Sequence, residues 1–277
     1  MIEEFDCIFI SYDEENADEN WRELKLKIPK AKRVNRVRGI GAAHDAAALL
    51  ADTPYFFTVD GDNKIEDDFF FKVTFPLIQD AIYVWRCQNA VNGLIYGYGG
   101  VKLWDKRLFN NAGNSSYTDH ATEKTSIYKI IPSIASITHF NTSPYMSWRS
   151  AFRECVKLCL NSRENKDKTA IERLKIWLSV GAHAEHGDWS IFGAHLGVQA
   201  SLKSSRDELS RLINDYDLLN TIFLANSGNK DLFRECNSIS NDYPAAFRNF
   251  NILSKNASLL AVNEQRRAFL ATNCRTL

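Results

Sequence analysis

Residues 54–63 read Pro-Tyr-Phe-Phe-Thr-Val-Asp-Gly-Asp-Asn, and this stretch is the most informative about the fold. Its apolar and aromatic first half predicts a buried β-strand, and two aspartates, Asp60 and Asp62, follow that strand directly. In extended geometry both carboxylates can face the same side at the end of the strand. Gly61 between them leaves room for a ligand to approach closely. Taken alone, the same letters also fit an ordinary Asp-Gly turn between two strands, so the surrounding elements decide the interpretation.

The segments before this stretch alternate between strand and helix patterns. Residues 5–10 are typical of a buried strand, residues 16–27 have helical spacing up to Pro29, residues 32–37 predict a second strand, and residues 40–51 predict an Ala-rich helix. The order strand, helix, strand, helix, strand predicts a parallel sheet with helices on its faces. Because ligands of such sheets bind at the carboxyl ends of the strands, this position favours a functional role for the two aspartates.

The rest of the chain divides into a strand-containing part and a helical part. Further strands are expected at residues 81–88, 96–103 and 136–140. Residues 110–126 form a polar loop that is long for a compact domain and typical of a functional loop. From about Ser147 the pattern is helical. We therefore predict an α/β fold with a mostly parallel sheet and flanking helices in residues 1–200, and a helical C-terminal region in residues 201–277.

Composition excludes several classes of protein. The 34 basic and 34 acidic side chains cancel, so no bulk positive field exists to bind nucleic acid, although local basic patches stay open. Residues 1–6 are acidic without an apolar core, and no run of about 18 apolar residues occurs. We expect neither a secretory signal nor a membrane span. The six cysteines include no Cys-x-x-Cys pair, which favours buried free thiols in a reducing cytoplasm over a zinc site.

Motifs narrow the chemistry further. Neither a Walker lysine loop nor a Gly-x-Gly-x-x-Gly fingerprint occurs, which disfavours P-loop NTPases and ordinary Rossmann dehydrogenases. A hard cation such as Mn²⁺ or Mg²⁺ takes carboxylate and phosphate oxygens together. The start of the helix at 40–51, with Arg38 before it, is a plausible anion site on physical grounds. The aspartate pair and this helix start together indicate a site for a metal and a phosphate group.

This arrangement resembles the nucleotide-binding half of GT-A glycosyltransferases of the family-2-like kind. The resemblance implies that Asp60 and Asp62 hold Mn²⁺ or Mg²⁺ against the diphosphate of a nucleotide sugar, with UDP as the usual nucleotide. It also implies that the loop after the first strand contacts base and ribose, and that the second helix begins near the diphosphate. The residues matched to donor binding are Ser11, Tyr12, Asp13, Arg38, Gly39, His44, Asp60, Gly61 and Asp62. A nucleotidyltransferase would usually carry a Gly-rich, basic loop after the first strand, which residues 11–14 do not match.

A second resemblance covers most of residues 5–190. The segments 83–86, 92–103 and 143–149 are similar to glycosyltransferases of large tailed phages, some of which add sugars to 5-hydroxymethylcytosine in DNA. It implies transfer of a hexose, or a pentose such as arabinose, to modified cytosine of phage DNA in the host cytoplasm. The alternatives are transfer to a glycan or other surface acceptor, and a non-catalytic sugar-nucleotide-binding module. Residues 96–102, rich in Tyr and Gly, fit a floor under a sugar or base as well as a kinked hairpin.

The remaining candidates are acidic residues and histidines late in the chain. Glu154 lies near a predicted helix start, where inverting GT-A enzymes commonly carry the general base, and Asp119 in the polar loop competes with it. His186 is a candidate metal ligand, because some GT-A enzymes use a late histidine in this way. An ordinary charged helix face and a solvated, capped loop explain Glu154 and His186 equally well. Residues 22–38, which hold eight basic side chains, either contact phosphate or neutralise the acidic residues 3–19.

Overall fold

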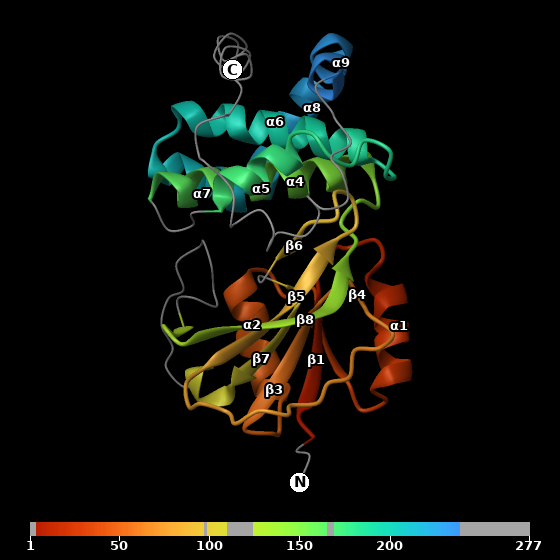
Figure 1. Cartoon of the computed structure of the whole chain (residues 1–277), viewed down its shortest axis with the longest axis vertical. Coiled ribbons are helices and arrows are strands. Elements are labelled where there is room, and N and C mark those ends of the chain that lie inside the picture. Colours follow the sequence, from red (N-terminus) through yellow and green to blue (C-terminus); the bar gives the residue numbers. More distant parts are fainter. Residues whose placement is uncertain (1–3, 97–98, 110–123, 165–168, 239–277) are drawn as a thin grey trace. The chain divides into compact units, whose positions relative to one another are not determined.

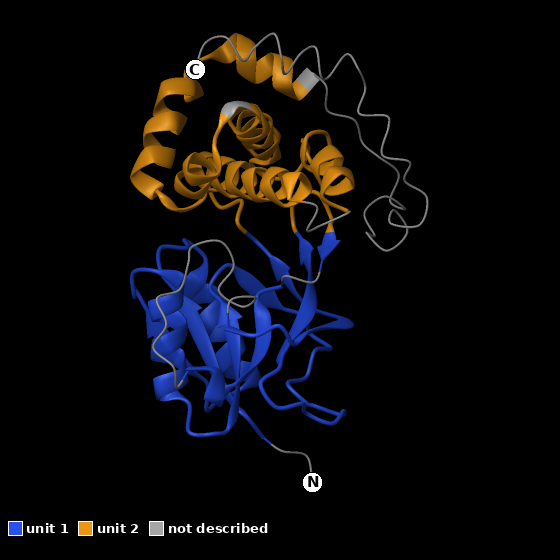
Figure 2. Cartoon of the chain, turned by 90° about the vertical axis from the view of Figure 1, so that its left-hand side faces the viewer, with its two compact units in different colours: residues 1–89, 95–139 blue, residues 90–94, 140–277 orange. Residues whose placement is uncertain are grey.

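The structure is a computed structural model that describes residues 4–96, 99–109, 124–164 and 169–238. Two compact units divide the chain, residues 1–89 with 95–139 (unit 1) and residues 90–94 with 140–277 (unit 2), as Figures 1 and 2 show. Asp119 and most of the polar loop lie outside the described residues.

Unit 1 is built on a mixed sheet whose described strands have the order β2-β1-β3-β7-β5-β8-β4, with β6 paired to β5. The strands are β1 (Asp6–Ser11), β2 (Lys32–Asn35), β3 (Tyr55–Asp60), β4 (Asn63–Ile65), β5 (Ile82–Asn89), β6 (Ile95–Tyr96), β7 (Val101–Asp105) and β8 (Tyr128–Thr138). The helices are α1 (Ala17–Lys27), α2 (Ile40–Leu50) and the 3₁₀ helix η1 (Lys106–Phe109). The strands β1, β2, β3, β5 and β8 run in one direction, and β4, β6 and β7 run against them. The predicted α/β class with a mostly parallel sheet is confirmed.

The two faces of the sheet are covered by different helices (Figure 1). Side chains alternate along β3, so that Phe56 packs with the alanines of α2 while Phe57 packs with Leu24 of α1. Both phenylalanines are fully buried. The small side chains of α2, such as Ala47, let its backbone lie close to the sheet, which explains why an Ala-rich segment forms this layer.

Two strands differ from the expected ranges. The segment 96–103 is interrupted, because β6 ends at Tyr96 and β7 begins at Val101. The strand expected at 136–140 is the last part of the longer β8. The first half of β8 was not predicted because it contains Pro132, and proline cannot donate a hydrogen bond to a neighbouring strand. The register of β5 against β8 shifts between Trp85 and Cys87, opposite this proline, which is how a proline is accommodated within a paired strand.

The five strands that share a direction end at one edge of the sheet, the carboxyl edge. Only two residues, Gly61 and Asp62, separate β3 from β4, yet these strands do not pair with each other. Instead β4 pairs with β8, while β3 pairs with β1 and β7. The turn at residues 60–62 therefore crosses between non-adjacent strands at the carboxyl edge, unlike the turn of a simple hairpin.

Unit 2 is helical over its described residues. Its helices are α4 (Pro144–Arg163), α5 (Ala170–Trp177), α6 (Gly187–Lys203), α7 (Arg206–Asn214), α8 (Tyr216–Ser227) and α9 (Lys230–Ser238). Helix α4 begins earlier than Ser147, because Ser143 caps it and Pro144 occupies its first turn. A Cβ on Gly193 of α6 would lie 2.2 Å from the carbonyl oxygen of Trp148, so glycine permits the close approach of α4 and α6. The predicted domain boundary after residue 200 stays a prediction, and residue 200 itself lies inside α6.

Two further features concern the helices and the cysteines that the structure describes. Within the described residues, none of the helices has the length and apolar character needed to cross a membrane. The five described cysteines are free, and four of them are buried, as expected for structural thiols. Burial raises the pKa of the Cys87 thiol to about 11.

Candidate functional site

The turn that carries Asp60 and Asp62 is held by backbone contacts from three neighbouring elements of unit 1. The Asp60 N–H donates to the carbonyl oxygen of Gly100 at 2.9 Å. The side-chain amide of Asn20, on α1, donates to the carbonyl oxygen of Gly61 at 2.9 Å. The His139 N–H, just after β8, donates to the carbonyl oxygen of Asp62 at 2.8 Å. The two carboxylates therefore start from a fixed backbone, as a preorganised binding site requires.

A third carboxylate, Glu14, lies against this turn. A Cβ on Gly61 would lie only 2.7 Å from Glu14 Oε2, so glycine is what makes room for the glutamate. Burial, followed by the charges of Asp60 and Glu14, raises the pKa of Asp62 to about 7. Burial also raises the pKa of Glu14, with the charges of Asp13 and Asp60 acting in the same direction. The cluster is therefore an electrostatically strained group of acids.

Asn63 fixes the orientation of Asp62. Its Oδ1 accepts hydrogen bonds from Ser136 Oγ at 2.8 Å and Thr138 Oγ1 at 3.0 Å. The amide nitrogen faces Asp62, and Nδ2 donates to Asp62 Oδ1 at 2.7 Å. A Cβ on Gly100 would lie 2.2 Å from the same nitrogen. One oxygen of Asp62 is thus committed to Asn63, and the carboxylate cannot rotate freely.

Lys102 supplies the positive charge beside the cluster. Its Nζ lies 3.2 Å from Asp60 Oδ2, and its side chain is 13% exposed against 38% for Asp60. The clustered carboxylates Glu14, Asp60 and Asp62 thus face a single described ion pair with a basic side chain. The cluster keeps an excess of negative charge, in a place where the sequence pattern predicted a cation site.

The donor set fits a divalent cation that also binds phosphate. Within the described ranges, no three His, Cys, Asp or Glu side chains form a group that could hold a metal ion by themselves. Magnesium-like ions commonly use one or two carboxylates and complete their shell with substrate phosphates and water. Asp60 and Asp62 provide such a pair, and the raised pKa of Asp62 is the effect expected of a partly buried acid beside other acids.

The residues expected to contact the base and ribose lie at the end of β1. Ser11 is buried, and its hydroxyl donates to Asn35 Oδ1 at 3.0 Å while accepting from Arg33 Nε at 2.9 Å. Tyr12 is 40% exposed, and its N–H donates to Glu14 Oε2 at 2.7 Å. Asp13 is exposed. Of these candidates, Tyr12 and Asp13 present accessible side chains at the carboxyl edge, while Ser11 joins β1 to β2.

The residues expected near the diphosphate lie at the start of α2. Arg38 and Gly39 are exposed, and Gly39, which occupies the N-cap position with φ 95°, has no side chain to cap the helix. Because β2 ends at the carboxyl edge, α2 begins there and directs its first N–H groups toward it. His44, which the resemblance matches to donor binding, is buried on α2, and its role there stays a prediction. Its Nδ1 lies 2.8 Å from the carbonyl oxygen of Ile40, and its ring lies 4.9 Å from that of Trp104.

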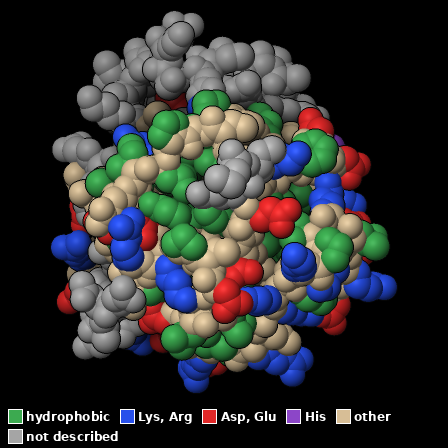
Figure 3. Space-filling model, turned by 90° about the horizontal axis from the view of Figure 1, so that it is seen from below, with side chains coloured by type: hydrophobic (Ala, Val, Ile, Leu, Met, Phe, Trp, Pro, Cys, Tyr) green, Lys and Arg blue, Asp and Glu red, His purple; other side chains and the backbone are tan. Residues whose placement is uncertain are grey.

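The basic segment 22–38 is partly neutralised by acids of unit 1. Arg33 Nη1 lies 2.6 Å from Asp18 Oδ1, and Lys32 Nζ lies 2.6 Å from Asp52 Oδ2. On the face shown in Figure 3, the coloured basic and acidic side chains are interspersed. These pairs support mutual neutralisation for this part of the segment.

The remaining candidates belong to unit 2 or lie outside the described residues. Glu154, on α4, pairs with the buried Arg173 of α5 at 2.7 Å, which gives it a structural contact between helices. His186 precedes α6 with φ 51°, and its carbonyl oxygen accepts from Ser147 Oγ at 2.7 Å. Asp119 lies outside the described ranges. The roles of all three as base or metal ligand stay predictions.

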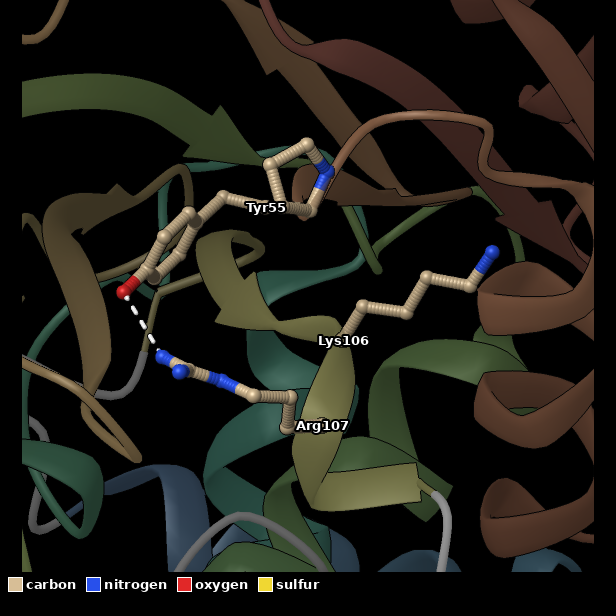
Figure 4. A pocket seen from close by; sticks show the side chains of 4 residues that line it. Tyr55, Lys106 and Arg107 are labelled. Atoms are coloured by element: carbon tan, nitrogen blue, oxygen red, sulfur yellow. Dashed lines mark hydrogen bonds between the residues drawn. The ribbon is translucent and has the colours of Figure 1, made fainter.

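A cavity of about 340 Å³ lies at the opposite end of β3, lined by Pro54, Tyr55, Lys106 and Arg107 (Figure 4). Its basic groups already have partners in the chain. Arg107 contacts both oxygens of the buried Asp105 and lies 3.3 Å from the Tyr55 hydroxyl. Lys106, which extends away from Arg107 in Figure 4, donates to the carbonyl oxygen of Ala51. The basic side chains that line the cavity are therefore engaged in structural contacts within the chain.

Sequence reasoning gave Asn63 and Lys102 no role beside the aspartates, and it placed Glu14 only in the loop expected to contact base and ribose. Lys102 is brought to Asp60 by the pairing of β7 with β3, a non-local contact that spacing along one chain does not show. Asn63 has a local signal, since it directly follows the second aspartate, but its two hydroxyl partners come from β8.

Comparison with known proteins gives distant matches. A chain described as a glucose-1-phosphate thymidylyltransferase from Bacillus anthracis, in complex with a sucrose, is 13% identical with a TM-score of 0.30, over 46% of this chain and 68% of that chain. HddC from Yersinia pseudotuberculosis is 14% identical with a TM-score of 0.28, over 47% of this chain and 70% of that chain. No protein-family model and no curated protein matches the chain. Similarity at this level carries no functional argument, so function is argued from the site itself.

Proposed function

We propose that this chain is a metal-dependent glycosyltransferase that uses a nucleotide sugar, with UDP as the expected nucleotide. The observation that carries the proposal is the fixed carboxylate pair Asp60 and Asp62 at the carboxyl end of β3, whose negative charge exceeds the positive charge of Lys102, the ammonium that contacts it among the described residues. A site of this charge, with a helix start whose N-cap residue is a glycine on the same edge, suits a cation and a diphosphate together.

Each part of the site has a role in this proposal. Asp60 and Asp62 would hold Mn²⁺ or Mg²⁺, and Asn63 orients Asp62. Arg38 and the start of α2 would bind the diphosphate, while Tyr12 and Asp13 would contact the base and ribose. The chemistry that a bound divalent cation supplies is neutralisation of the diphosphate as it leaves the sugar.

The acceptor and the catalytic base are separate parts of the proposal. Modified cytosine in DNA is the proposed acceptor, and it rests on the resemblance of residues 83–86, 92–103 and 143–149 to phage enzymes. A base in a duplex has to be flipped out to reach such a site. Glu154 and Asp119 are the proposed general bases, and His186 is a proposed further metal ligand. Because Glu154 is paired with Arg173, a role as base requires that pair to open.

The binding part is tested with Asp62→Asn and isothermal titration of UDP in the presence and absence of Mn²⁺. We expect the Mn²⁺-dependent gain in UDP affinity to fall by about 10- to 100-fold, because one ligand of the cation is lost. Asp67→Asn is the matched control, since the Asp67 side chain is fully exposed and lies 3.9 Å from its nearest ammonium, Lys27. Equal Mn²⁺-dependent binding in wild type and Asp62→Asn would remove the metal from the proposal.

The transfer part is tested with nucleotide sugars, hydroxymethylated DNA and glycan acceptors, read by mass spectrometry of nucleosides and glycans. Sugar on hydroxymethylcytosine supports the DNA acceptor, and sugar on a glycan replaces it with the glycan alternative. Nucleotide binding without release of diphosphate in any mixture would identify a non-catalytic binding module. In an active mixture, Glu154→Gln should keep donor binding and lose transfer, whereas retained transfer would exclude Glu154 as the base.

A further inference from the structure

Lys102 reaches the aspartate pair because of the register between two neighbouring strands. In the antiparallel pair of β3 and β7, Lys102 lies opposite Thr58. Side chains two residues apart on a strand share a face, so Thr58, Asp60 and Lys102 project on the same side of the sheet. This is the side covered by α2, whose start is the proposed diphosphate site. The lysine therefore projects from the same face of the sheet that α2 covers.

The ammonium lies beside one of the two oxygens that Asp60 would offer to a bound cation. Its Nζ lies 3.2 Å from Asp60 Oδ2, and its side chain is only 13% exposed. Two cations at one carboxylate oxygen repel each other strongly when water screens them poorly. Asp62 Oδ1 already accepts from Asn63 and Glu14 Oε2 from the Tyr12 N–H, whereas Asp60 Oδ2 is the carboxylate oxygen that the ammonium contacts.

We propose that Lys102 competes with the divalent cation for Asp60, and that a diphosphate relieves the competition by drawing the ammonium away. The inference rests on the proposed function and adds to it a residue and an order of binding. Lysine suits this exchange because its ammonium is a compact point charge on a flexible four-carbon stem, and it binds phosphate well. The consequence is weak binding of Mn²⁺ alone and tighter binding of Mn²⁺ with a nucleoside diphosphate.

The test is a titration of the full chain with Mn²⁺, first alone and then with UDP added. Electron paramagnetic resonance measures the concentration of the free ion in each titration. Lys102→Met removes the charge and keeps most of the stem. We expect it to bind Mn²⁺ alone about tenfold more tightly than wild type, which corresponds to about 1.4 kcal/mol. The gain in Mn²⁺ affinity on adding UDP should be smaller in this variant than in wild type.

Two further variants separate competition from a general effect of losing a lysine. Lys102→Arg keeps the charge and should bind Mn²⁺ alone as weakly as wild type. Lys32→Met removes a lysine that is paired with Asp52 at the other edge of the sheet, and it should leave Mn²⁺ binding unchanged. Thermal unfolding of each variant checks that the fold is intact.

The outcomes distinguish this inference from the proposed function. Equal or weaker binding of Mn²⁺ alone by Lys102→Met, or no binding by either protein, would overturn the competition. Tighter binding of Mn²⁺ alone by Lys102→Met supports the competition, and an equal gain on adding UDP in both proteins would overturn its relief by the diphosphate. Failure of UDP to bind to wild type with Mn²⁺ would instead count against the proposed function, because the competition is decided in the titration without nucleotide.

Discussion

Acidic side chains near the two ends of strand β3 differ in how their charge is compensated. At the amino end, the buried Asp105 accepts hydrogen bonds from Arg107 and from the N–H of Asp80. Burial alone would raise the pKa of Asp105, but these hydrogen bonds outweigh it and hold the pKa below its ordinary value. At the carboxyl end, burial and neighbouring acids raise the pKa of Asp62 to about 7.

The difference separates a structural ion pair from a candidate binding site. An acid whose charge is matched within the chain contributes to folding, whereas clustered acids with little compensation cost stability and await an external cation. The cavity beside Arg107 has a volume of about 340 Å³, but the charges that line it are matched within the chain, so it is not a candidate binding site. The balance of charge, rather than the presence of a cavity, distinguishes the two ends of β3.

The largest expected effect of breaking this contrast is at the amino end. Asp105→Asn should destabilise the protein by about 3 kcal/mol, because it removes the charge that binds Arg107 and disturbs the acceptor for the Asp80 N–H. Urea unfolding followed by near-ultraviolet circular dichroism measures the change. The exposed Asp52→Asn, which loses a pair with Lys32, is the control and should change stability little. A loss no larger than that of the control would contradict the structural role given to Asp105.

A smaller effect of opposite sign is expected at the carboxyl end. The folded-state pKa of Asp62 lies above its ordinary value of 3.8, so the folded state binds the proton more tightly and stability falls as pH rises from about 4 to about 7. Asp62→Asn removes this cost. At pH 8 without metal it should stabilise the protein by about 2 kcal/mol, allowing for partial solvent access.

The pH dependence provides the check on that prediction. The Asp62 carboxyl is protonated in both folded and unfolded chains only below its ordinary pKa of 3.8, so the gain from Asp62→Asn should shrink steadily as pH falls toward 4. Thermal unfolding midpoints of wild type and variant between pH 4 and pH 8 measure the difference. A constant difference over this range, or a destabilised variant at pH 8, would show that Asp62 does not carry the strain assigned to it.

Local patterns in the sequence predicted most of the fold. The alternation of apolar strands and helices up to residue 60 gives β1 to β3 within about one or two residues of their observed ends, because short-range periodicity and helix-ending residues such as Pro29 are local signals. β8 was predicted only in its last part, since Pro132 interrupts the pattern and the bulge that accommodates it depends on pairing with β5.

The candidate site was predictable only where its chemistry is contiguous along the chain. Asp60 and Asp62 follow a strand and were found from that position alone. Lys102 and the hydroxyls of Ser136 and Thr138 reach the site through sheet pairing, which no spacing rule specifies. Likewise, the pairing of Glu154 with Arg173 depends on the packing of α4 against α5, which no local pattern specifies.

The central claim is that the carboxyl end of β3 binds a cation together with a nucleotide. The most direct measurement is a thermal-shift panel of nucleoside diphosphates and nucleotide sugars, each with and without Mn²⁺. The account predicts a rise in the unfolding midpoint that requires both Mn²⁺ and one kind of nucleotide, since ligands that bind the folded state stabilise it. No shift with any nucleotide, in the presence or absence of Mn²⁺, would contradict the account and leave Asp60-Gly61-Asp62 as a turn.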